Sequence, residues 1–205
     1  MSRVALLIVL GAVGLSRTAV AESCEAASAL RADLERESTR ADRWNLAWRI
    51  VYTAGAAGQF AIAASGAADH DNTRSLYVGG AKSTLAALGH WFAPLVVHVP
   101  LTTGDACADR AALRAAAERA ADDERDAFWS AHLVGLVVNL GGTLVLAEMT
   151  SWKVGLTSFA LGYPVGLLST YTMPRASWHR IGETTWAANA LVGEGRYALV
   201  VSGTF

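Results

Sequence analysis

Four apolar segments dominate the pattern of the chain and lie at 46–65, 83–101, 128–149 and 154–172. Each is close to the roughly 20 residues that a helix needs to cross the hydrocarbon core of a bilayer. Each also contains polar or helix-bending residues, among them Arg49, His90, Asn139 and Pro164. A central polar residue weakens the insertion of an isolated helix, so such helices depend on packing against one another. The pattern predicts an all-α, integral membrane four-helix bundle.

The first 21 residues have the pattern of a secretory signal peptide. Arg3 precedes an apolar run at 4–15, and Ala19-Val20-Ala21 is a typical cleavage site. The run is too short to span a bilayer, which favours a cleaved signal at 1–21 over an uncleaved N-terminal anchor.

Charged, alanine-rich stretches precede both pairs of apolar segments. We expect exported amphipathic helices at 22–45 and 102–127, transmembrane hairpins at 46–101 and 128–172, and an exported or interfacial tail at 173–205. This threading places Cys24 and Cys107 on the same, oxidising side of the membrane, and so predicts a structural disulfide between them.

The two charged stretches also resemble each other. Residues 24–36 and 107–119 share an initial Cys, a Leu-Arg-Ala triplet and a closing Glu-Arg pair. A Trp and an apolar pair of segments follow in both, which predicts two tandem repeats of a Cys-led helix and a transmembrane hairpin. The alternative is that two Ala- and Arg-rich helices look alike through composition alone.

Composition supports a membrane setting. Hydrophobic residues make up 53% of the chain and charged residues 17%, and the net charge is −1. The low charge favours lipid contact, and the charge balance argues against a nucleic-acid partner. We expect location in a bacterial cell membrane, the inner membrane first, with both termini on the exported side. The expected partners are lipid and other membrane-protein subunits, or further copies of this chain.

Two histidines are the candidate ligands. His98 and His132 are predicted near the outer ends of the second and third spans, where facing imidazoles can hold a metal ion or a haem iron. The alternative is a structural role for each, and no cofactor is required by any other pattern. Ser158, Gly162 and Gly166 form a small-xxx-small ladder typical of helix packing in membranes.

No catalytic constellation stands out, since H-E-x-x-H, G-x-S-x-G and C-x-x-C are all absent from the sequence. These features favour a non-enzymatic accessory or scaffold subunit of a membrane assembly. One alternative is a small redox or transport membrane protein that holds haem or a metal ion between its histidines. A third is a soluble exported bundle that binds an apolar ligand.

Overall fold

The computed structural model describes residues 24–101 and 103–181, and the backbone of 186–193 and 196–203. The predicted signal peptide lies outside the described residues. The elements are, in order, α1 (Cys24–Ala64), α2 (His70–Phe92), α3 (Arg110–Met149), α4 (Trp152–Tyr171), α5 (Ala176–Ile181), β1 (Trp186–Gly193) and β2 (Arg196–Gly203). The predicted helical class is thus confirmed for the described part up to Ile181.

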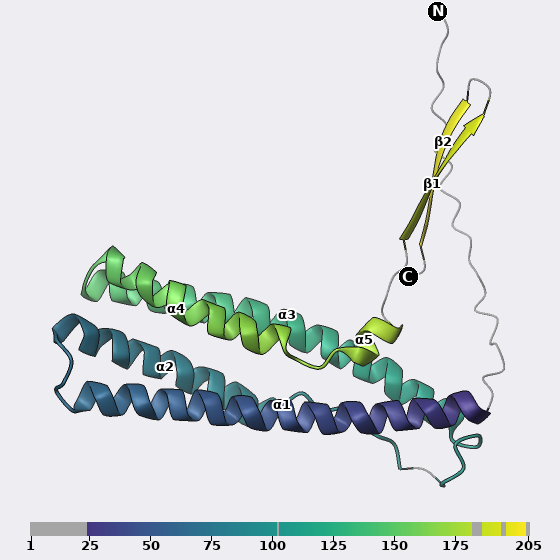
Figure 1. Ribbon diagram of the computed structural model, residues 1–205, viewed down its shortest axis with the longest axis horizontal. Helices are drawn as coiled ribbons and strands as arrows, with labels where there is room; N and C mark the ends of the chain where they lie inside the picture. The colour runs from purple at the N-terminus through teal and green to yellow at the C-terminus, as the bar shows by residue number, and fades with distance from the viewer. Residues whose placement is uncertain (1–23, 102, 182–185, 194–195, 204–205) are drawn as a thin grey trace, which may run out of the picture.

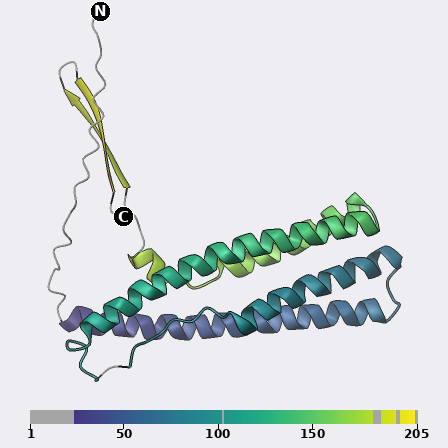
Figure 2. The same cartoon turned by 180° about the vertical axis from the view of Figure 1, so that it is seen from behind.

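The helices form two hairpins that lie side by side (Figures 1 and 2). In one, α2 folds back along the second half of α1, and in the other α4 folds back along α3. Asp69 begins α2 by accepting a hydrogen bond from the backbone N–H of Asn72, and Ser151 caps α4 in the same way through Val154. These caps satisfy backbone donors that a helix start leaves unpaired.

The second helix differs from the expected segment at 83–101. It begins at His70 and ends at Phe92, so Lys82 lies in its middle rather than in a loop. The helix stops before Pro94 because proline disfavours helical backbone in the residue that precedes it. The chain then continues without helix through residues 93–101.

One half of the molecule has an ordinary hydrophobic core. It contains the first parts of α1 and α3, the non-helical segment and α5, and its buried side chains are Ala27, Leu34, Ala41, Leu95, Val97, Leu113, Ala116, Ala117, Ala120, Phe128 and Met173. Buried Asn45 holds the non-helical segment 93–101 against α1. Its side-chain amide donates to the Leu95 carbonyl at 2.8 Å and accepts from the Leu95 N–H at 3.2 Å. We call this part the charged half, since most ion pairs of the described residues lie on its surface.

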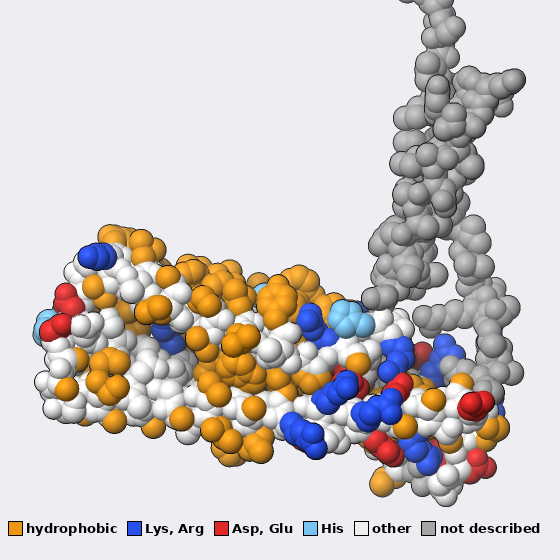
Figure 3. Space-filling view, in the orientation of Figure 1, with side chains coloured by type: hydrophobic (Ala, Val, Ile, Leu, Met, Phe, Trp, Pro, Cys, Tyr) orange, Lys and Arg blue, Asp and Glu red, His pale blue; other side chains and the backbone are white. Residues whose placement is uncertain are grey.

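The other half has the opposite polarity, and we call it the apolar half. Among the described residues, the exposed large hydrophobic side chains lie only within 46–101 and 129–171, and all but Val96 and Leu101 belong to this half. They include Ile50, Leu85, Val137, Leu144 and Leu161, which are 56–71% exposed. Figure 3 shows hydrophobic side chains spread over this half, whereas charged side chains gather over the charged half and at the opposite tip.

By length and hydropathy alone, α3 is the one helix in the described part of the chain that could cross a membrane. The fold therefore confirms long helices with apolar surfaces, and the four-span arrangement stays a prediction.

The tail contains two strands that the all-α prediction missed. β1 and β2 pair antiparallel, with Trp186 opposite Gly203 and Gly193 opposite Arg196. The signal was present in the sequence, because Gly193-Glu194-Gly195 separates two runs rich in Val, Leu and Ala.

The disulfide between Cys24 and Cys107 is confirmed. It joins the first residue of α1 to the segment before α3, at the free end of the charged half. In the chain-entropy description, closing a loop of 83 residues stabilises the fold by about 4–5 kcal/mol.

We expect reduction to lower the unfolding midpoint of the purified protein, measured by circular dichroism with and without reductant. A variant carrying both Cys24→Ser and Cys107→Ser is the control and should match the reduced protein. Equal midpoints for oxidised and reduced protein would contradict a stabilising bridge.

Candidate functional sites inside the two halves

The polar groups inside the apolar half gather around Lys82. Its ammonium group, carried by α2, donates to Ser158 Oγ on α4 at 3.0 Å and to Asn139 Oδ1 on α3 at 3.3 Å. A further contact, to the Ser158 carbonyl, is 3.4 Å long. All of these acceptors are neutral, so the Lys82 charge is solvated by dipoles and has no carboxylate in these contacts.

Glycines make the room for this side chain. A Cβ on Gly142 would lie 2.8 Å from Lys82 Cδ, and a Cβ on Gly162 would lie 3.0 Å from Lys82 Nζ and 2.8 Å from Asn139 Oδ1. Any other residue at either position would displace the lysine. The cluster of Lys82, Asn139, Ser158, Gly142 and Gly162 is called the Lys82 cluster below.

Two further polar links join the hairpins at other depths. At one end, the indole N–H groups of Trp44 and Trp48 both approach Thr172 Oγ1 at 3.3 Å. At the other end, Arg74 donates to the carbonyl of Met149. The hairpins are thus fastened at both ends of the apolar half and in its middle.

The predicted helix-packing residues have different surroundings. Ser158 and Gly162 belong to the Lys82 cluster, whereas a Cβ on Gly166 would meet no atom within 4 Å. The closest approach of α3 and α4 instead uses Gly155, where a Cβ would lie 2.5 Å from the Thr143 carbonyl oxygen. Gly155 precedes Ser158 by one turn, so the contact stripe runs one turn closer to the start of α4 than the sequence pattern suggested.

The predicted ligand histidines lie in different settings. His132 is half-buried among the rings of Phe128, Trp129 and Tyr171, with centroids 4.8–6.0 Å away. His98 is exposed on the non-helical segment and lines a shallow groove that Asp123 and Asp126 also line. No group of three His, Cys, Asp or Glu side chains suited to a metal ion occurs in the described ranges. Haem or metal binding between His98 and His132 stays a prediction.

Two aromatic clusters, each with an arginine, lie where the two halves meet. Arg49 donates to the His90 carbonyl at 2.8 Å and stacks over Trp91 at 4.8 Å. Arg175 stacks over Phe128 at 4.8 Å and lies 5.8 Å from the Tyr171 ring. Cations over aromatic faces gain electrostatic energy while keeping their charged heads near water.

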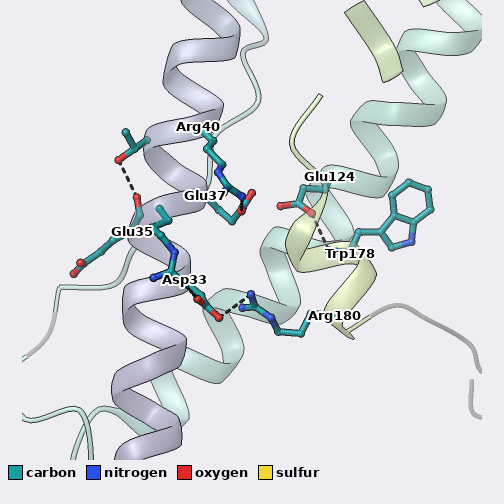
Figure 4. Close-up of polar contacts among 9 residues, drawn as sticks. Asp33, Glu35, Glu37, Arg40, Glu124, Trp178 and Arg180 are labelled. Atoms are coloured by element: carbon teal, nitrogen blue, oxygen red, sulfur yellow. Dashed lines mark hydrogen bonds and ion pairs between the residues drawn. The ribbon is translucent and has the colours of Figure 1, made fainter. Parts of the chain in front are cut away.

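The charged half contains two buried carboxyl groups, Glu37 on α1 and Glu124 on α3, which are 3% and 0% exposed. Glu37 Oε1 accepts from Arg40 at 2.8 Å, and Glu124 Oε2 accepts from the Trp178 N–H at 2.7 Å. The second oxygen of each carboxyl has no hydrogen-bond partner. Figure 4 shows the two side chains extending towards each other between the helices.

Burial raises the pKa of Glu124 above its ordinary value. Hydrogen bonds from Trp178 and Ser177 oppose this effect, and the nearby Glu37 charge adds to it. Sequence reasoning missed this pair, since both residues look like exposed charges on Ala-rich helices.

No protein-family model, curated protein or solved structure matches this chain. The functional argument therefore rests on the geometry described above.

The close contact at Gly155 gives a matched test of helix packing. We expect Gly155→Ala to destabilise the protein by about 1–3 kcal/mol, because the added methyl group overpacks the α3–α4 contact. Gly166→Ala is the control, and should be neutral or slightly stabilising since its surroundings are open and alanine favours helix. Thermal unfolding of both variants measures the difference, and equal midpoints would contradict the packing.

Proposed function

We propose that this protein is an integral membrane subunit whose apolar half crosses the bilayer and whose charged half lies at one membrane surface. The observation that supports this most directly is the reversal of polarity along the same helices. In the charged half, alanine and leucine are inside and ions outside. In the apolar half, Lys82, Asn139 and Ser158 are inside, and bulky aliphatic side chains face outwards. A water-soluble protein rarely exposes so large an apolar surface.

The dimensions of the apolar half support the same proposal. α4 has 20 residues and α2 has 23, which correspond to lengths of about 30 and 35 Å at 1.5 Å per residue. A hydrocarbon core of about 30 Å fits both. Exposed Trp91 and Trp129 lie near one end of this half and exposed Trp152 at the other, as expected of side chains at the two lipid–water boundaries.

Three of the four proposed spans fall below the hydropathy threshold that α3 passes. Small side chains lower the mean hydropathy of all three, and Arg49, Gln59 and Lys82 lower that of α1 and α2 further. These three side chains have hydrogen-bond acceptors within the protein. Internal bonding removes much of the cost of placing them in lipid.

The orientation that we propose puts the charged half and both termini on the exported side, in the inner membrane of a bacterium. The disulfide supports it, since bridges persist in oxidising compartments. We also infer that the chain arose by tandem duplication. In both hairpins the long helix contains an amide that bonds the carbonyl of a glycine four residues earlier, Gln59 to Gly55 and Asn139 to Gly135.

Within this class, the function we propose is that of a non-enzymatic accessory or scaffold subunit. The support comes from α1, where Ala54 and Gly58 are exposed and a Cβ on Gly58 would meet no atom within 4 Å. Small residues let helix backbones approach closely in lipid. Because this face is not used inside the fold, it is suited to a helix of another membrane subunit or of a second copy.

Topology can be tested by labelling single new cysteines in intact cells with a membrane-impermeant maleimide. Asp126→Cys and Asp71→Cys are matched positions, with exposed side chains in the charged half and at the opposite end of the molecule. We expect Asp126→Cys to react in intact cells and Asp71→Cys to react only after permeabilisation. Reaction of both cysteines in intact cells would contradict the proposal that the apolar half crosses the membrane. The reverse pattern would show that the charged half faces the cytoplasm.

Assembly can be tested with Gly58→Leu, which adds bulk to the outward face of α1. We expect it to weaken association with the partner, or self-association, at least about tenfold, equivalent to about 1.4 kcal/mol. Gly141→Leu is the control, because Gly141 is also exposed with open space around it but lies on α3. Size-exclusion chromatography with light scattering in a mild detergent measures both. A wild-type protein that is a strict monomer without a partner would contradict the proposal.

A further inference from the structure

The unpartnered oxygens of Glu37 and Glu124 pose a physical problem. Both atoms are buried, and a buried acceptor without a donor costs about 1–3 kcal/mol, or more when the group is charged. Two ionised carboxylates that extend towards each other also repel (Figure 4). A single proton between the two oxygens removes the repulsion and gives each atom a partner.

The surroundings indicate which carboxyl carries the proton. Glu37 has a cationic partner, because Arg40 pairs with it at 2.8 Å. Among the described residues no cation pairs with Glu124, and its hydrogen bonds come from neutral donors on α5. A protonated Glu124 can keep Oε2 as the acceptor for Trp178 and donate from Oε1 to Glu37 Oε2.

We propose that the facing carboxyl groups of Glu37 and Glu124 share one proton and so form a proton-binding site that joins α1, α3 and α5.

The other charged groups near this site are already paired or point to solvent. On α1, Asp33 pairs with Arg36 and with Arg180 of α5, the latter at 2.7 Å. On α5, His179 is exposed and stacks on Trp178. The non-helical segment contributes Leu95 and Val97 to this core, and its His98 is exposed. No second base contacts Glu124 among the described residues.

The raised pKa of Glu124 sets the direction of the pH effect. The folded state binds this proton more tightly than the unfolded chain, so the stabilisation is fully present below the unfolded pKa. It is lost as pH rises through the higher folded pKa. A rise in pH should therefore weaken the packing of α1 against α3, where the two ionised carboxylates then repel each other.

The test uses the full-length, oxidised protein and the variant Glu124→Gln. Glutamine can accept from Trp178 and donate to Glu37, so it imitates the protonated acid and should fold. Wild-type protein should show the infrared C=O band of a buried carboxylic acid at a pH where exposed glutamates are already ionised, and Glu124→Gln should lack it. Raising the pH until this band disappears should lower the melting temperature of the wild type more than that of Glu124→Gln. Glu118→Gln, at an exposed glutamate, is the control and should behave as wild type.

Two results would overturn the proposal. One is a wild-type spectrum without this band, or the same pH response in Glu124→Gln as in wild type. The other is a rise in melting temperature when calcium is added near neutral pH, present in wild type and absent in Glu124→Gln, which would assign the site to a cation. Neither result depends on whether the apolar half crosses a membrane.

Discussion

The structure depends on the contact between the ammonium group of Lys82 and the polar groups of α3 and α4. Each hairpin is held together by its own helix contacts, but the hairpins meet in the apolar half through few polar links. In lipid the hydrophobic effect does not drive helices together, so close packing and interhelical hydrogen bonds have to do so. Gly142 and Gly162 allow the lysine to reach both helices, which explains why small residues occur where it passes.

The same helices take part in two different kinds of packing. α1 and α3 run through both halves without a break, so each changes from an alanine-rich soluble core to an apolar outer surface along one axis. At the boundary the chain has Trp44 and Trp48 hydrogen-bonded to Thr172, and arginines stacked on aromatic rings. Beyond it, the charged half is closed by the disulfide and by α5. The proposed proton site lies in this closed part, where protein side chains alone bury the two carboxyl groups.

The sequence predicted the helical class and the cysteine pair, because these depend on local spacing or on residue type. It did not predict the start of α2, since Arg74 and Lys82 make 70–82 resemble a polar loop. The available signal for the start of this helix was Asp69, a residue type that often caps helix N-termini. The Glu37–Glu124 pair could not be found from the sequence, because only the packing of α1 against α3 separates two buried glutamates from the many exposed ones. The strands were not predicted, although Gly193 and the two residues after it separate two short runs rich in Val, Leu and Ala.

The central claim is that the apolar half lies in lipid, and spin-label accessibility measured in reconstituted bilayers tests it most directly. Single cysteines for labelling would replace Leu140 in the apolar half and Asp122 in the charged half, both exposed. Molecular oxygen concentrates in lipid, whereas a charged nickel chelate stays in water. The account predicts that a label at 140 relaxes with oxygen and is protected from nickel, with the reverse at 122. Equal access of nickel to both labels would contradict it.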